Sequence, residues 1–94
     1  MTNDNDERAV TIIIGRVFKQ KGGTAEGVHI LLVAPDDDTA VRTALEALTR
    51  EGYAEAELDQ IGDMEGPPDD EPHMSAYQGA LEGEVSIVLI DKDF

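Results

Sequence analysis

The chain has 94 residues, a length that suits one domain with one hydrophobic core. It contains no cysteine, which excludes disulfides, thiolate metal sites and a cysteine nucleophile. Its formal net charge is −14, from 21 acidic and 7 basic residues, and such a charge disfavours direct binding to nucleic acid or to an anionic membrane.

Residues 1–8 are polar and acidic, so we expect a frayed leader followed by a single α+β domain over residues 9–94. The leader lacks the basic patch and apolar run of a signal peptide. No segment approaches the roughly 18 apolar residues that a membrane span requires. The sequence therefore predicts a soluble, cytoplasmic protein.

Two strongly apolar segments come first in the domain. Residues 10–18 are rich in β-branched side chains, and residues 28–34 are almost continuously apolar, which predicts two strands, the second in a central position. Residues 19–27 between them include Gly22 and Gly23, which supply the backbone freedom of a turn. We expect these segments to form a hairpin.

A helix is predicted directly after the second strand. Asp36, Asp37 and Asp38 follow Pro35, and aspartates at this place accept hydrogen bonds from the free N–H groups of a first helical turn. The apolar residues that follow recur at helical spacing and predict one buried face, formed by Ala40, Val41, Ala44, Leu45 and Leu48. Gly52 suits the end of the helix.

The second half predicts a strand, a loop, a helix and a last strand. Residues 53–62 alternate, with acids and Ile61 on one side and Ala56 and Leu58 on the other, which predicts an edge strand with an acidic exposed face. Residues 62–72 contain three prolines and five acids and are expected to form the main loop. Residues 73–82 predict a short helix and residues 84–92 a strand inside the sheet.

The predicted order is therefore β-β-α-β-α-β. Right-handed crossovers would place both helices on one face of a four-stranded mixed sheet, leaving the other face open. This is a two-layer α+β sandwich that resembles the ferredoxin-like architecture loosely, because the first hairpin stands where the strict order has a helix.

The sequence contains few candidates for catalysis or metal binding. The three aspartates lack the spacing of a calcium loop, so helix capping is favoured over a cation site. For the loop acids the prolines favour a fixed acidic display, and weak binding of a divalent ion is the alternative. His29 lies in an apolar strand, which favours a structural or interface histidine over a catalytic one. His73 follows five acids in the preceding eleven residues, which favours its protonated form. A solvated residue at the helix start is the favoured interpretation, and a pH-sensitive contact is the alternative. We expect no enzyme, catalytic residue, metal or cofactor.

The acidity is concentrated in the second half of the chain. Residues 52–94 hold twelve acids and one base, a net charge of −11. Successive same-face strand residues lie about 6.5 to 7 Å apart, near the spacing of phosphates along one nucleic-acid strand, so such a row is able to imitate a backbone. The candidate partner-binding residues are Glu55, Glu57, Asp59, Asp63, Glu65, Asp69, Asp70, Glu71 and His73. The alternative explanation is a solubilising face that also protects an edge strand.

Two functional hypotheses follow from this sequence. The first is a non-enzymatic module that docks on a basic protein surface, such as that of a nucleic-acid-binding protein, as an inhibitor, an immunity-type protein or a nucleic-acid mimic. The second is a small regulatory domain that senses a ligand and forms a homodimer through its sheet, suggested by the two apolar strands. An enzyme that uses the loop acids and His73 is a third hypothesis.

Overall fold

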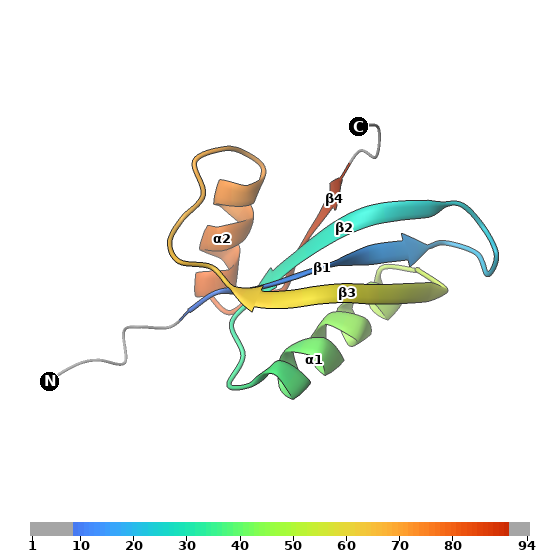
Figure 1. Cartoon of the computed structure of the whole chain (residues 1–94), viewed down its shortest axis with the longest axis horizontal. Coiled ribbons are helices and arrows are strands. Elements are labelled where there is room, and N and C mark those ends of the chain that lie inside the picture. The colour runs from blue at the N-terminus through green and yellow to red at the C-terminus, as the bar shows by residue number, and fades with distance from the viewer. Residues whose placement is uncertain (1–8, 91–94) are drawn as a thin grey trace, which may run out of the picture.

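The computed structural model describes residues 9–90, so the predicted leader and residues 91–94 lie outside the described part of the chain. Within residues 9–90 the elements are β1 (Thr11–Phe18), β2 (Ala25–Leu32), α1 (Asp37–Arg50), β3 (Glu55–Asp63), α2 (His73–Leu81) and β4 (Ser86–Ile90). Figure 1 shows their arrangement. The α+β class and the order β-β-α-β-α-β are confirmed.

The four strands form one open sheet in the order β3-β1-β2-β4, and every neighbouring pair is antiparallel. The two apolar strands β1 and β2 lie in the middle. Ile13 lies opposite Ile30 and Ile12 lies opposite Leu31. Because side chains alternate between the faces of a sheet, the first pair points to one face and the second pair to the other. The centre of the sheet is therefore apolar on both sides.

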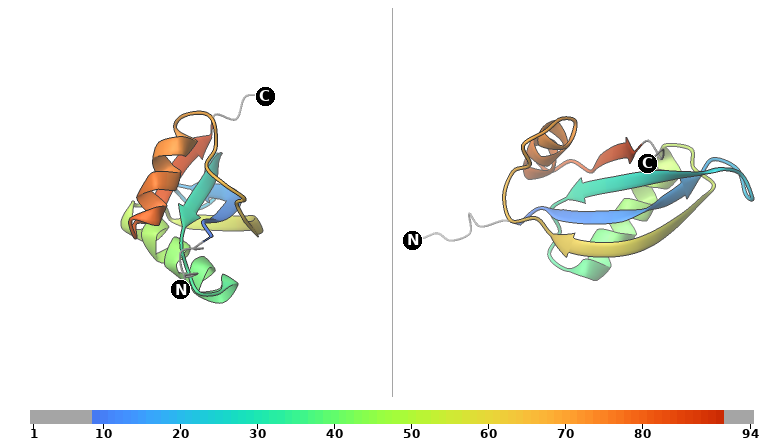
Figure 2. Two further views of the ribbon diagram at one scale, coloured as in Figure 1. Left: turned by 90° about the vertical axis from the view of Figure 1, so that its left-hand side faces the viewer. Right: turned by 45° about the horizontal axis from the view of Figure 1, so that its top comes forward.

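Each face of the sheet is covered by one helix. On one face, α1 packs on aliphatic side chains of β1 and β2 in a cluster of buried residues: Ile13, Val17, Val28, Ile30, Leu32, Ala40, Ala44 and Leu48. On the other face, α2 contributes Ala76 and Ala80 to a second cluster with Val10, Leu31 and Val88. Figure 1 shows α2 above the sheet and α1 below it, and in the right-hand view of Figure 2 the strands pass in front of α1.

Three details of the predicted architecture are therefore wrong. The sheet is antiparallel instead of mixed, and the helices lie on opposite faces instead of one. The last strand, which we expected inside the sheet, is β4 at its edge, because β3 instead of β4 pairs with the free side of β1. The handedness rule applies to crossovers between parallel strands. Among consecutive strands, only β2 and β3 are parallel, on either side of β1, and α1 forms the crossover between them. Since β3 and β4 run in opposite directions, the connection through α2 is free to pass over the other face.

The pairing of β1 with β3 contains a β-bulge. Gly15 lies opposite Leu58 whereas its neighbour Ile14 lies opposite Gln60, so Asp59 is the extra residue. The bulge reverses the alternation and brings Ile61 opposite Ile13, on the face that α1 covers. The prediction that Ile61 shares a face with the acids of this strand is wrong for this reason.

Helix α1 begins as the sequence predicts. Asp36 Oδ1 accepts a hydrogen bond from the backbone N–H of Thr39 at 2.7 Å, and hydrogen bonds from Thr39 lower the pKa of Asp36. The buried face of α1 differs from the predicted one at Leu45, which is 40% exposed, and at Ala47, which is buried although we did not predict it.

With 14 and 9 residues, neither α1 nor α2 is long and apolar enough to cross a membrane.

The close approach of β1 to β3 at the bulge leads to a first prediction. A Cβ atom added at Gly15 would lie 2.9 Å from Leu58 Cα and would also clash with the carbonyl oxygen of Glu57, both of them backbone atoms that cannot move aside. We expect Gly15→Ala to lower the free energy of unfolding by about 1 to 3 kcal/mol, the usual cost of forcing extra volume into a packed site.

Chemical denaturation of this variant and of Gly62→Ala measures the effect. Gly62 lies on β3, and a Cβ added there meets nothing within 4 Å. The control should change stability by no more than about 0.5 kcal/mol. Equal stability of the two variants would show that the strands do not approach each other so closely.

Candidate protein-interaction surface

The acids predicted on the third strand lie on β3, at one edge of the sheet. Glu55, Glu57 and Asp59 are exposed, while Ala56 and Leu58 between them are half buried against the α1 cluster. The predicted edge strand with an acidic exposed side is confirmed. Its charges also oppose pairing with the edge of another sheet.

Arg16 of β1 contacts two of these three acids. Its Nη2 atom lies 2.8 Å from Glu57 Oε1 and 3.3 Å from Asp59 Oδ1. All three side chains are about half exposed, so solvent screening limits each ion pair to about 0 to 1 kcal/mol of stability. The contacts matter more for the surface potential, because the cation offsets part of the charge of β3.

The row of carboxylates is therefore less regular than the sequence suggests. A strand that imitates a phosphate backbone requires evenly spaced charges without counter-ions of its own. The bulge at Asp59 interrupts the even spacing, and Arg16 stands beside two of the three charges. The β3 part of the candidate surface is acidic but does not present a uniform row.

Asp63 ends β3, and the loop between β3 and α2 carries the other predicted acids, Glu65, Asp69, Asp70 and Glu71; all five are exposed. Two of them have contacts within the fold: Asp63 Oδ1 accepts a hydrogen bond from Thr11 Oγ1 at 3.5 Å, and Glu71 Oε1 accepts one from the backbone N–H of Ser75 at 3.1 Å. The second contact satisfies a free N–H group of the first turn of α2. Glu71 therefore has a structural duty that the sequence did not reveal.

Four acids of the candidate surface have side chains without an ion pair or hydrogen bond to any of residues 9–90: Glu55, Glu65, Asp69 and Asp70. The structure does not bring all four together. Glu55 begins β3 and the loop follows its end, so about 26 Å of strand separates them at about 3.3 Å per residue. The loop is consequently the densest part of the acidic surface.

His73 lies against His29 of β2 instead of standing alone at the surface. His29 Nδ1 is 2.9 Å from His73 Nε2, with the ring centroids 5.1 Å apart and the ring planes tilted by 56°. One of these nitrogens must donate and the other accept, so at least one ring is neutral. Burial and the neighbouring His73 lower the pKa of His29. The pair ties the first turn of α2 to the sheet.

Two of the contacts that the sequence did not predict, those of Arg16 and His29, are long-range. Arg16 lies 41 residues before Glu57, and His29 lies 44 residues before His73. The chemical types offered a signal, since an arginine and an acid strand or two lone histidines are natural partners. The register of β1 and β3 decides the contact of Arg16, and the packing of α2 against β2 decides that of His29.

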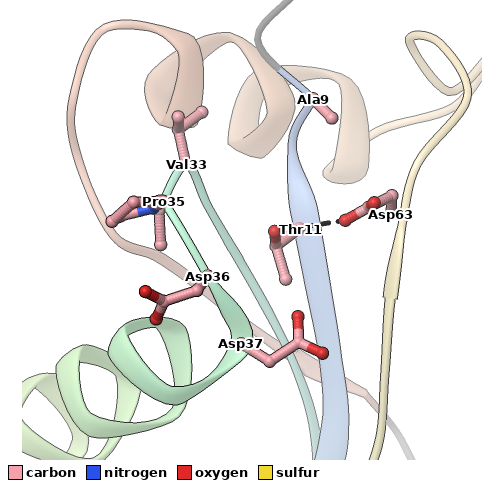
Figure 3. A pocket seen from close by; sticks show the side chains of 8 residues that line it. Ala9, Thr11, Val33, Pro35, Asp36, Asp37 and Asp63 are labelled. Carbon is pink, nitrogen blue, oxygen red and sulfur yellow. Dashed lines mark hydrogen bonds between the residues drawn. The ribbon is translucent and has the colours of Figure 1, made fainter.

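An open hollow of about 410 Å³ lies where the chain passes from β2 to α1, as Figure 3 shows. Its acidic lining consists of Asp36, Asp37 and Asp63. Asp36 caps α1, and Asp63 accepts a hydrogen bond from the buried Thr11, so two of these carboxylates stabilise the fold. Among residues 9–90, no three histidine, aspartate or glutamate side chains are grouped to hold a metal ion.

The whole second half of the described chain is one-sided in charge. Residues 52–90 contain ten acids and no lysine or arginine. Arg16, on a neighbouring strand, is the cation that pairs with acids of this half within the described residues.

Comparison with known proteins adds no relationship, because no protein family, curated protein or solved structure matches the chain.

The histidine pair leads to a second prediction. Because the pKa of His29 is lowered in the folded state from an ordinary value of 6.5, the unfolded chain binds this proton more readily than the folded one. His29 is neutral in both states well above pH 6.5 and then has no effect. As the pH falls below 6.5, protonation increasingly favours the unfolded chain, so stability should decrease through this window.

Urea unfolding of the wild type and of His29→Asn between about pH 5.5 and 8 tests this expectation. Carboxylates contribute equally to the pH dependence of stability in both proteins. The difference in stability between wild type and variant at each pH therefore isolates the contribution of His29. The variant should lose less stability on acidification than the wild type. Identical slopes, or an imidazole of His29 that titrates above 6.5 by NMR, would contradict the assignment.

Proposed function

We propose that this chain is a non-enzymatic interaction module that docks on a basic surface of another protein. The supporting observation is the one-sided charge of residues 52–90, whose ten acids face no lysine or arginine of their own half. The exposed loop between β3 and α2, with Glu65, Asp69 and Asp70, forms the centre of the proposed contact. The acids of β3 extend this contact along the edge of the sheet.

Long-range electrostatics would bring such a partner to the loop. Acids on one side of a small domain create a field that accelerates encounter with a basic surface, over a distance of about 8 Å at physiological salt. Pro67, Pro68 and Pro72 restrict the backbone of the loop. A restricted loop loses less conformational entropy on docking than a freely moving one, which favours binding.

The proposed partner is a protein whose basic surface already serves to bind an anion, such as a nucleic-acid-binding protein. An inhibitor or an immunity-type protein would act by covering that surface. The bulge at Asp59 and the contacts of Arg16 argue for general charge complementarity over a close copy of a phosphate backbone. The partner surface therefore needs density of positive charge more than a particular spacing.

Charge reversal in the loop is the third prediction. We expect Asp69→Lys combined with Asp70→Lys to weaken binding to a captured partner by about tenfold or more, equivalent to about 1.4 kcal/mol, because each change turns an attraction into a repulsion. Isothermal titration calorimetry at increasing salt measures the affinity. The wild-type affinity should fall steeply with salt, and that of the variant should fall less.

A matched control is Glu46→Lys combined with Glu82→Lys, which changes the net charge by the same amount at exposed sites on α1 and after α2. This control should retain most of the affinity. Equal losses in the two variants would mean that only net charge matters and that the loop is no docking site. Binding insensitive to both salt and charge reversal would refute the proposed function.

A further inference from the structure

The two outer strands of the sheet present very different edges. β3 carries exposed acids and a β-bulge, two features that prevent pairing with another strand. β4 (Ser86–Ile90) has the sequence Ser-Ile-Val-Leu-Ile, with no charge, proline or glycine, and pairs with β2 without a register shift. Nothing in the sequence of β4 protects its outer edge.

The outer edge of β4 is also open in the described structure. β4 is the last strand of the sheet, and no turn or loop of residues 9–90 forms a backbone hydrogen bond with it. Leu89, opposite Val28, is 53% exposed on the face that α1 covers, and it is the most exposed large hydrophobic residue described. An apolar, regular and open edge of this kind favours the addition of a further strand.

We propose that the β4 strands of two copies of this chain pair antiparallel about a two-fold axis and join the two sheets into one. Every strand pair in the sheet is already antiparallel, so a symmetric partner continues the same pattern. In the register centred on Val88, Leu89 of one copy lies opposite Ile87 of the other. Both residues point to the α1 face, so the pairing covers the exposed leucine.

A second copy fits this edge better than a basic peptide does. β4 has no acidic side chain, so a basic strand would place its charges opposite aliphatic residues and leave them unpaired. The copy places aliphatic side chains opposite aliphatic ones. The acids that attract a basic partner lie mainly on β3 and its loop, beyond β1 and β2 from this edge.

The two copies repel each other through their net charge of −14. Salt screens this repulsion, so association through β4 strengthens as salt increases, whereas docking on a basic partner weakens. The opposite dependence on salt separates this inference from the proposed function, and neither depends on the other. Since a single pair of short strands buries little surface, the dimer is weak and forms only at high protein concentration.

Analytical ultracentrifugation of the full chain, at up to about 1 mM protein and in both low and about 0.5 M salt, tests the pairing. The decisive variant is Leu89→Lys, and its matched control is Leu45→Lys on α1, an exposed leucine with the same change of charge. We expect Leu89→Lys to raise the dissociation constant by about tenfold or more, since each lysine then lies opposite the aliphatic Ile87 of the other copy and diagonal to the second lysine on the same face. Leu45→Lys should dimerise like the wild type or slightly better.

Hydrogen exchange identifies the edge that forms the contact. Amides of β4 should become protected as the protein concentration rises, and those of β3 should not. A strict monomer at about 1 mM in high salt would overturn the proposal. A dimer that survives Leu89→Lys, or protection on β3 instead of β4, would overturn it equally, because the copies would then meet elsewhere.

Discussion

The structure depends on the β1–β2 pair, two neighbouring strands that carry aliphatic side chains on both faces. Ile13 and Ile30 point to one side, and Ile12 and Leu31 to the other. A sheet with this pattern must be covered on both faces, because leaving either one in water forfeits about 25 cal/mol for each Å² of apolar surface. The two helices lie where this requirement places them, α1 below the sheet and α2 above it.

The two helices pack on the sheet in different ways. α1 is long and uses alanines and Leu48 to fill one face. α2 is short, and its buried residues are Ala76 and Ala80, small side chains that allow close packing. Gly79 shows how closely α2 approaches β4, since a Cβ added at Gly79 would lie 2.9 Å from Ser86 Oγ. The pair of His29 and His73 adds a polar contact at the other end of the helix.

Six acids of this protein fall into two groups with different roles. Asp36, Glu71 and Asp63 stabilise the fold by accepting hydrogen bonds at helix starts and beside β1. Glu65, Asp69 and Asp70 have no such contact among the described residues and remain available to a partner. Acidity thus protects one edge of the sheet and concentrates on one loop, while the opposite edge stays uncharged. This asymmetry makes separate contacts at the two edges physically reasonable.

The sequence by itself determined the elements of this protein and some of its local contacts, such as the hydrogen bond by which Asp36 caps α1. Apolar runs, the aspartates before α1 and the prolines of the loop act over a few residues, so their effects are readable along the chain. Only the tertiary structure decided that the helices cover opposite faces, that a bulge turns Ile61 to the α1 face, and that Arg16 and His29 meet Glu57 and His73. These outcomes depend on strand register and direction, which arise from competition among distant segments and leave no mark in any single stretch of sequence.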